Sequence, residues 1–368
     1  MNNEMWVGSF KSWCLESYAP GKIILSGEHS VVYGKPALSF SIDKYTKMVL
    51  FVNAIEKNNN LFLKIFLKDV NNHIQIEKNE FLNFYKIYNK EIGQEDIKCL
   101  FMSMIVDIFI ELGYDEHQFE LFVNKYIFDC EISSSITIGY GLGSSAAFNV
   151  CLVNGFSYAI CKLSNHEILD KSKICLISNK AEKFFHTNPS GIDVVTSVNG
   201  GGIFFHGIED YKVSKNLDFF EKNNLKMILV STEVKRNCKE FTGKVSEFKN
   251  QNPKLFADYI YKIGDLTSEI INFVQNKNNV DEFLDLIKEN QIMLKNINVS
   301  NEKIDYIINI LNQNNICGKI TGAGGGGYIL VIIKEKDYNK FINISTDNKF
   351  NVLNFNLENK GSFIKEKI

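Results

Sequence analysis

The chain has 368 residues, which at roughly 150 residues per domain predicts two domains. Apolar residues make up 45% of the chain and charged residues 23%, an ordinary globular composition that excludes a chain disordered throughout. The 41 lysines and arginines nearly balance 43 acidic residues, and this net charge of −2 argues against a dedicated nucleic-acid binder. Arg236 is the only arginine, so a ligand phosphate would be held by lysines, backbone N–H groups or a metal.

The cysteines, the N-terminal residues and the apolar runs indicate where in the cell the protein is expected to lie. The 8 cysteines form no C-x-x-C pair and no metal-ligand spacing, which predicts reduced thiols in a cytoplasmic protein. The N-terminal residues show no basic segment followed by an apolar one, so no secretory signal is predicted. No apolar run approaches about 18 residues, and the stretch near residue 105 is broken by Asp107 and Glu111, so no membrane contact is expected.

The first 140 residues are predicted to form strands and one helix. Short β-branched or alternating runs predict strands at 22–25, 47–52, 61–67, 120–128 and 131–138, with a turn at 58–60. Between the third and fourth runs, apolar residues from Ile97 to Leu112 recur at steps of three and four. This spacing predicts an amphipathic helix that Gly113 ends.

A glycine loop at 139–147 interrupts this pattern, and the elements that follow it are predicted in chain order. Helices are predicted at 145–161 and 168–185, the second ending before Pro189 because proline cannot continue a helix, and Gly200–Gly202 precede a strand at 203–206. A strand at 225–231 is followed by a helical region over 238–313 and by strands at 328–333 and 352–357. The composition changes near residue 210, which predicts one domain over 1–210 and a second over 211–368.

Three glycine-containing segments are candidates for a ligand site. The first, APGKIILSGEH at 19–29, places a lysine, a glutamate and a histidine at a strand end, and its alternative is a surface hairpin with solvated charges. The second, GYGLGSSAA at 139–147, leads into a helix and could cradle phosphate, or be a turn with a capping serine. It is neither a Walker A loop nor G-x-G-x-x-G. The third, TGAGGGG at 321–327, indicates close approach of a ligand to the backbone, or a flexible hairpin loop.

Two carboxylates stand out beside these loops. Glu182 lies four residues before His186, on the same face of a predicted helix. Asp193 follows a tight turn and precedes the apolar run Val194–Val195, which is interpreted as a strand. An acid in this position is either buried and paired or engaged in chemistry, and the residues alone leave both interpretations open.

Taken together, these segments resemble the GHMP family of small-molecule kinases. That family carries a P-x-K turn near the start, a G-L-G-S-S-A-A loop in the middle and a late G-A-G-G-G loop, and this chain has all three in that order. Within the family it is most similar to the mevalonate kinases, through the runs at 19–34, 141–147, 186–193 (HTNPSGID), 200–202 and 319–327, and the pair Arg236-Asn237. The resemblance implies an α+β fold in two lobes, the first like domain 2 of ribosomal protein S5 and the second ferredoxin-like, with the substrates in the cleft between them.

The resemblance also implies roles for individual residues. It makes Lys22 and Asp193 the catalytic pair, with Asp193 taking the hydroxyl proton, and Ser145 and Glu182 the Mg²⁺ ligands. The ATP phosphates would lie on Gly139, Gly141, Leu142, Gly143, Ser144, Ser145 and Ala146. The acceptor alcohol would lie near Lys22, Glu28, His29, Asp193, Gly322, Ala323 and Gly324.

The implied reaction is transfer of a phosphoryl group from ATP, with Mg²⁺, to the primary alcohol of mevalonate, which gives 5-phosphomevalonate. Three features depart from the family pattern: no proline begins the second motif, Cys238 follows the Arg-Asn pair, and Val194 follows Asp193. The last two bear on the acceptor more than on the reaction. The alternatives are another GHMP kinase acting on phosphomevalonate or a sugar, an inactive sensor that binds ATP and a metabolite, and a structural protein that binds no nucleotide. A homodimer is left open.

Overall fold

The computed structural model describes residues 13–54, 59–88, 96–186, 188–215, 217–235, 238–276 and 279–367. Several residues named above lie outside this part of the chain: residues 1–12, Asn58, Thr187, Arg236, Asn237 and the side chain of Cys238.

Within the described residues, the strands form two sheets. The larger sheet contains β1 (Trp13–Ser26), β2 (Ala37–Ala54), β3 (Leu61–Leu67), β4 (Asn72–Glu77), β5 (Tyr126–Ser134), β6 (Gly202–Phe205), β7 (Tyr211–Ser214) and β12 (Phe363–Lys367). The smaller sheet contains β8 (Leu225–Ser231), β9 (Cys317–Ile320), β10 (Tyr328–Lys334) and β11 (Asn351–Asn354).

The larger sheet has the order β12-β1-β2-β5-β3-β4, and β6 pairs with β2 and β7 with β6. Its pairs are antiparallel except β3 with β5. The smaller sheet is antiparallel throughout, in the order β11-β8-β10-β9. These two sheets form the centres of two lobes and confirm the predicted two-lobed α+β class.

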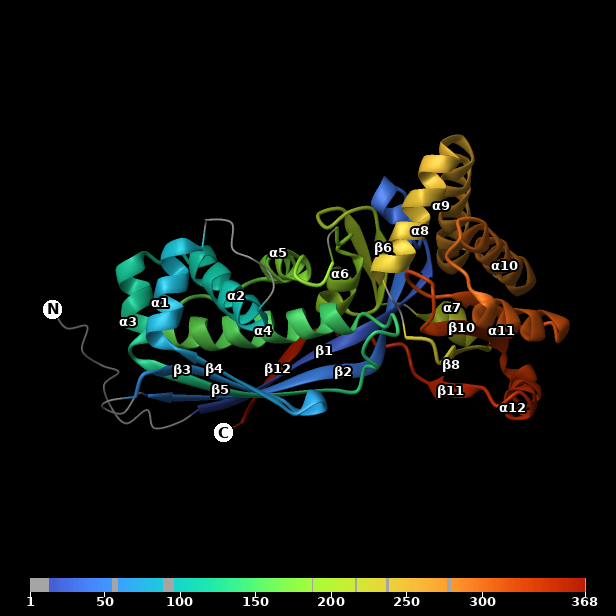
Figure 1. Cartoon of the computed structure of the whole chain (residues 1–368). Coiled ribbons are helices and arrows are strands. Elements are labelled where there is room, and N and C mark those ends of the chain that lie inside the picture. Colours follow the sequence, from blue (N-terminus) through green and yellow to red (C-terminus); the bar gives the residue numbers. More distant parts are fainter. Residues whose placement is uncertain are drawn as a thin grey trace.

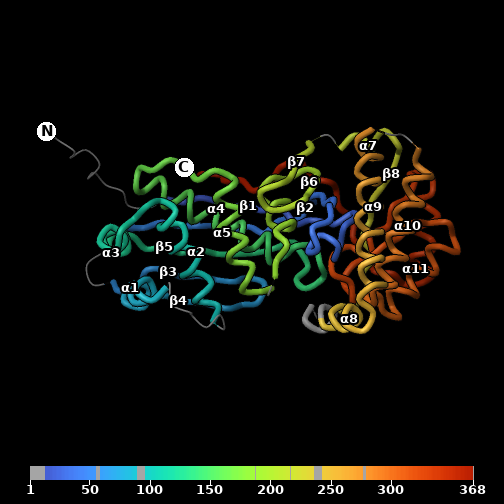
Figure 2. The backbone as a smooth tube through the Cα atoms, turned by 90° about the horizontal axis from the view of Figure 1, so that it is seen from above, coloured from blue at the N-terminus to red at the C-terminus, as the bar shows by residue number. Residues whose placement is uncertain are grey.

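Helices cover both sheets. In chain order they are α1 (Lys78–Ile87), α2 (Ile97–Glu111), α3 (Glu116–Val123), α4 (Ser144–Ser164), α5 (Lys171–Glu182), α6 (Ile192–Asn199), α7 (Asp218–Lys222), α8 (Cys238–Gln251), α9 (Pro253–Asn276), α10 (Val280–Asn296), α11 (Glu302–Gln313) and α12 (Tyr338–Asp347). Figure 1 shows α1 to α5 on one face of the larger sheet. Figure 2, seen from above, shows α1 to α3 at one end of the molecule and α8 to α11 at the other.

The central helix of the first lobe is α4. It is long and apolar enough to cross a membrane by length and composition, but 72% of its most apolar window is buried inside the protein. It contacts β1, β2, α2, α5 and α6. Its apolar surface is therefore used in the core of the lobe, as expected for the core helix of a globular protein.

Three predicted strands differ from the structure. The run at 120–128 contains the end of α3 and only the start of β5, because Phe119, Phe122 and Val123 form one buried helical face and Asp115 and Gln118 form a capping box. The strand predicted over 131–138 ends with β5 at residue 134. The apolar run after Asp193 lies in α6, since its valines pack against neighbouring helices and that packing overrides their strand propensity.

The ends of other elements are close to the prediction. The strands predicted at 61–67 and 225–231 match β3 and β8, and the helical region predicted over 238–313 contains the four helices α8 to α11. The helices α1, α7 and α12 and the strands β4, β7, β9 and β12 were not predicted from the sequence. The division into domains 1–210 and 211–368 stays a prediction. The strand pairing shows that β7 and β12, which follow residue 210, belong to the larger sheet of the first lobe.

The C-terminal strand β12 is attached to β1 through a buried carboxylate. Figure 1 shows β12 beside β1, far from the elements that precede it in the chain. The Glu16 Oε1 atom lies 2.8 Å from the Lys47 ammonium on β2 and 2.7 Å from the Lys367 ammonium on β12, and Tyr18 donates a hydrogen bond to Oε2. The hydrogen bonds from Lys367 and Lys47 lower the pKa of Glu16 to about 2.

We expect Glu16→Gln to destabilise the protein at pH 7 by about 1–2 kcal/mol, because the amide loses both ion pairs. The pKa of Glu16 in the folded state lies below the value of an unfolded chain, about 4.3, so its contribution is present above that pH and is lost as the pH falls toward 2. Urea unfolding at pH 7 and pH 3 measures the difference. An equal loss of stability at both values would contradict a charge effect.

Candidate active site

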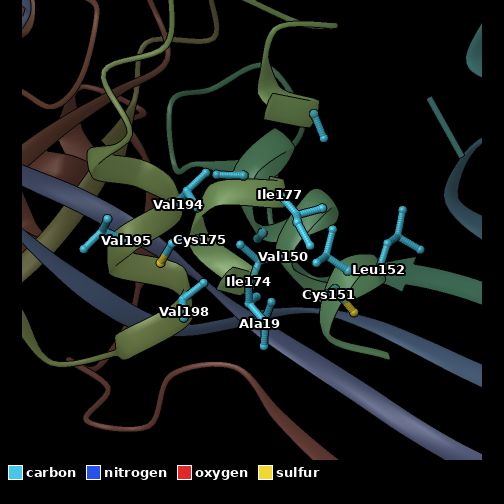
Figure 3. Packing of buried hydrophobic residues seen from close by; sticks show 14 of the residues in the cluster. Ala19, Val150, Cys151, Leu152, Ile174, Cys175, Ile177, Val194, Val195 and Val198 are labelled. Carbon is cyan, nitrogen blue, oxygen red and sulfur yellow. The ribbon is translucent and has the colours of Figure 1, made fainter. Parts of the chain in front are cut away.

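The site is built where α4, α5 and α6 pack against β1. Figure 3 shows that side chains from these elements form one apolar cluster, which includes Ala19, Val150, Ile174, Cys175, Ile177, Val194, Val195 and Val198. Each of the four elements contributes one polar side chain next to this cluster: Lys22 from β1, Ser145 from α4, Glu182 from α5 and Asp193 from α6. Core packing thus fixes the spacing of the four functional groups.

The Lys22 ammonium and the Asp193 carboxylate form an ion pair. Nζ lies 2.9 Å from Oδ1, and the lysine side chain is 3% exposed whereas that of Asp193 is 33% exposed. A charge as buried as that of Lys22 needs a partner, which Asp193 supplies. Asp193 also lies in the first turn of α6, where the helix dipole favours an anion. The aspartate is therefore paired on one side and reachable by solvent on the other.

The loop before α4 has the backbone that its glycines predict. Gly139, Gly141 and Gly143 all have positive φ, at 81°, 89° and 71°. Gly143 precedes the first turn of α4, and no side chain caps this helix. A turn with a capping serine is thereby excluded. An uncapped helix start after a glycine loop suits an anion such as phosphate.

This loop contacts Lys22 of the Lys22–Asp193 ion pair. The backbone N–H of Lys22 donates to the Leu142 carbonyl at 2.9 Å, and its ammonium lies 3.4 Å from the Gly141 carbonyl. A Cβ built on Gly143 would lie 2.9 Å from Cγ of Lys22. Glycine at residue 143 therefore makes room for the lysine as well as for the turn.

The hydroxyl of Ser145 and the carboxylate of Glu182 meet at the start of α4. Ser145 Oγ donates to Glu182 Oε2 at 3.1 Å and lies 3.3 Å from His186 Nε2. Asn149, one turn along α4, donates to the other oxygen, Glu182 Oε1, at 2.6 Å. The carboxylate is thus held from two sides with one oxygen toward the loop.

Burial controls the charge of Glu182. Desolvation, followed by the nearby Asp193 charge, raises the pKa of Glu182 to about 7, and the hydrogen bonds from Ser145 and Asn149 oppose this shift. Burial likewise lowers the pKa of His186, which keeps its imidazole neutral at physiological pH. An additional positive charge beside Glu182 would therefore be favourable.

These residues fit a magnesium ion that takes most of its ligands from a nucleotide. The described part of the chain holds no group of three or more histidine, cysteine, aspartate or glutamate side chains able to bind a metal alone. Mg²⁺ in phosphoryl-transfer sites keeps several waters and phosphate oxygens and uses only one or two protein ligands. Two adjacent oxygens, one on Ser145 and one on a carboxylate whose charge is otherwise costly, match that requirement.

The first glycine-containing segment is a buried element, which excludes a solvated hairpin. Glu28 pairs with the ammonium of Lys319 on β9, and both side chains are buried. Burial lowers the pKa of Lys319, and the Glu28 charge acts in the opposite direction. The observed contact of Glu28 is thus with the second lobe, and its predicted contact with the acceptor stays a prediction.

The third segment is also packed rather than flexible. The N–H groups of Gly325 and Gly327 donate to the carbonyls of Val299 and Val234 at 2.8 and 2.9 Å. A Cβ on Gly324 or Gly326 would lie 2.3 or 2.4 Å from these same carbonyls. The neighbour that requires glycine at these two positions is the protein backbone itself, rather than a ligand.

Only part of the predicted acceptor region is open to solvent. Ala323 is half-buried and its carbonyl lies 3.0 Å from His29 Nε2, whereas Gly322 and Gly324 are buried. The structure therefore brings His29 and Ala323 together across the lobes. It brings Lys22, Ser145, Glu182 and Asp193 together beside the loop 139–143.

Two polar residues of this region were not singled out from the sequence. Asn149 is an ordinary polar residue on a helix, but its position four residues after Ser145 places it on the same face. Lys319 is a lysine within the short buried strand Cys317–Ile320, and a charge in an apolar strand is a signal that a partner is required.

Comparison with known proteins decides the family. Models of the GHMP kinases N terminal domain and of the GHMP kinases C terminal region match residues 109–201 and 268–343. The mevalonate kinase of Pyrococcus abyssi is 30% identical over 338 residues, which cover 89% of this chain and 91% of that protein. The chain belongs to the GHMP kinase family. The mevalonate kinase of Archaeoglobus fulgidus is 30% identical, over 88% of this chain and 94% of that protein. The mevalonate kinase of Arabidopsis thaliana is 27% identical, over 87% of this chain and 90% of that protein.

Solved structures support the GHMP kinase fold. The mevalonate kinase of Methanococcus jannaschii has a TM-score of 0.70 at 24% identity, and covers 93% of this chain and 98% of that one. A galactokinase of Lactococcus lactis complexed with galactose has a TM-score of 0.69 at 16% identity, over 95% of both chains. Because the two scores are nearly equal, the fold alone does not select the acceptor.

We expect Gly143→Ala to displace Lys22, since its Cβ would lie 2.9 Å from the lysine Cγ. Turnover should fall at least about 100-fold, as when a reacting group is misplaced. Gly113→Ala is the matched control, because Gly113 also has positive φ, at 75°, and has open space at its Cβ position. Activity and urea unfolding should be measured for both. An equal effect of the two substitutions would show that backbone strain, and not contact with Lys22, is responsible.

We expect Glu182→Gln to stabilise the protein at pH 8 without magnesium or nucleotide, by about 1–3 kcal/mol. A raised pKa means that wild-type stability falls as the pH rises from about 4.5 to about 7, and the neutral amide removes this loss. The gain should therefore shrink at pH 5, where Glu182 is protonated. Thermal unfolding at both pH values checks this, and a lower melting temperature at pH 8 would contradict it.

Proposed function

We propose that the protein transfers the γ-phosphoryl group of ATP to the primary alcohol of mevalonate, which yields ADP and 5-phosphomevalonate. The observation that carries the proposal is the Lys22–Asp193 ion pair next to an uncapped helix start that follows a glycine loop. This arrangement supports the proposal, because a partly exposed carboxylate and a buried positive charge lie beside a backbone suited to phosphate, and phosphoryl transfer requires such groups.

In the proposed reaction the acceptor oxygen attacks the γ-phosphorus while the bond from that phosphorus to the β,γ-bridging oxygen breaks. Asp193 takes the proton of the alcohol through its solvent-exposed side. Lys22 holds Asp193 in place and stabilises the charge that develops on the transferred oxygens. The backbone N–H groups at the start of α4 bind the phosphates.

Ser145 and Glu182 would hold Mg²⁺, which when bound neutralises charge on the β- and γ-phosphates. Asn149 donates to Glu182 Oε1, so Oε2, next to Ser145, is the oxygen that would be available to hold the ion. The arrangement pre-orients both ligands before the ion arrives, and the raised pKa of Glu182 makes the positive charge of an ion favourable there.

Mevalonate as the acceptor rests on the sequence relatives rather than on the fold. Relatives of this name come from archaea, fungi and a plant, at 26–30% identity over most of this chain. The scarcity of arginine favours an acceptor without a phosphate, since Arg236 is the only fork-shaped donor available for one. Reduced thiols at Cys14, Cys99, Cys130 and others support a cytoplasmic location for this reaction.

The test is an ADP-release assay with mevalonate, phosphomevalonate, galactose and homoserine side by side. Mevalonate should give the highest kcat/KM by at least about 100-fold, because a site built to pair polar groups strongly rejects analogues that leave them unpaired. A higher kcat/KM with another acceptor would show that mevalonate is not the substrate, while the assignment as a kinase would stand. ATP binding without turnover of any acceptor would favour a sensor.

We expect Asp193→Asn to lower kcat by at least about 100-fold while the Kd of ATP stays within a few-fold, because the amide keeps the shape and removes the proton acceptor. Asp43→Asn is the control, since Asp43 also pairs with a lysine, Lys44, at 3.7 Å and is exposed to a similar degree. Turnover and melting temperature should be measured on one preparation. A destabilised Asp193→Asn enzyme with full turnover per folded molecule would contradict the mechanism.

A further inference from the structure

A lysine side chain lies against each end of the loop 139–143. A Cβ built on Gly143 would meet Lys22, and a Cβ built on Gly139 would lie 3.1 Å from Cε and 3.4 Å from Cγ of Lys235. Both glycines have positive φ. Lys22 comes from β1 in the first lobe, whereas Lys235 follows β8 of the second sheet. The loop thus lies between two lysine stems from different lobes.

The two lysines differ in the state of their charge. The Lys22 ammonium is buried and compensated by Asp193 at 2.9 Å. The Lys235 side chain is exposed, and it has no hydrogen-bond or ion-pair partner among the described residues. Among the described residues, Lys235 is therefore the one of the two that presents an uncompensated positive charge beside the loop.

The backbone that carries Lys235 is held in place. The Gly327 N–H donates to the Val234 carbonyl at 2.9 Å, and the Thr232 N–H donates to the Gly327 carbonyl at 2.9 Å. The Thr232 hydroxyl donates to that same carbonyl at 2.9 Å. These bonds fix the segment 232–234 on the glycine run, so the Lys235 stem leaves a rigid base and lies across Gly139.

We infer that Lys235 is a nucleotide-specificity residue whose ammonium binds the β- or γ-phosphate of ATP. This assignment rests on the proposed function, because it places the phosphates on the loop 139–143. It gives Lys22 and Lys235 separate tasks: the compensated charge serves the reacting groups, and the uncompensated charge recognises the polyphosphate. It also links the lobes, since the nucleotide would contact the loop of the first lobe and a lysine of the second.

The experiment compares the affinity of the full chain for MgATP, MgADP and AMP by calorimetry. Lys235→Met keeps an unbranched stem and removes the charge, and Lys235→Arg keeps the charge. Lys64→Met is the matched control, because Lys64 on β3 is also exposed and without an ion pair among the described residues. The Kd of MgATP should rise about three- to tenfold in Lys235→Met, the range for a partly exposed charge-assisted contact, and stay within twofold in the other two variants.

Phosphate number and salt give two further readouts. AMP binding should be unchanged in Lys235→Met, and added salt should weaken MgATP binding less in this variant than in the wild type. Gly139→Ala, which pushes the stem aside, should weaken MgATP binding in the same direction as Lys235→Met.

The possible outcomes separate this inference from the proposed function. The inference would be overturned by an unchanged MgATP affinity in Lys235→Met, or by equal losses of affinity in Lys235→Met and Lys235→Arg. In either case the proposed function would still hold if the wild-type protein phosphorylates its acceptor. An equal loss for AMP would also overturn it. A wild type that binds no ATP would overturn both the function and the inference.

Discussion

The buried charge of Lys22 is the constraint on which the rest of the site depends. An ammonium that is almost fully buried costs several kcal/mol unless it is paired, so the fold must bring a carboxylate to it. Asp193 does this from the start of α6, which is held in place by apolar packing against α4 and α5 (Figure 3). The same lysine needs space beside Gly143. The conformation of the glycine loop, the packing of α6 and the Lys22–Asp193 ion pair therefore all depend on burying this one charge.

Glu182 differs from Lys22, because among the described residues its buried negative charge is not paired with a positive one. When no ligand is bound, this charge lowers the stability of the folded protein. Its carboxylate is buried near the negative Asp193, and its pKa of about 7 records the cost of keeping it ionised. Asn149 and Ser145 reduce this cost but do not remove it. A bound cation would remove the remainder, so part of the binding free energy of a metal–nucleotide complex would come from relief of this unfavourable charge.

Local signals in the sequence were sufficient for part of the fold and site. The glycines at 139, 141 and 143 predicted a turn before a helix, and all three have positive φ, while the family resemblance implied that Lys22 and Asp193 act together. Long-range packing decided the rest. The valines after Asp193 have strand propensity, but they lie in α6, which packs against α4 and α5 and against the strands β1 and β2. The pair of Lys319 with Glu28 joins residues 291 positions apart, which neither periodicity nor spacing can reveal.

The buried Glu28–Lys319 pair is one of several contacts that join the two lobes. The groups proposed for chemistry come from the first lobe, whereas Lys319, Thr321 and Ala323 reach the end of β1 and its following turn from the second. Thr321 both accepts from the Ile24 N–H and donates to the Ile24 carbonyl, so the contact fixes the register between the lobes. Lys22 and Asp193 both belong to the first lobe, so side chains that the second lobe contributes along this border are not part of that ion pair. A mevalonate kinase and a galactokinase match this fold with TM-scores of 0.70 and 0.69, so the shared fold leaves the choice of acceptor to the side chains that each chain carries.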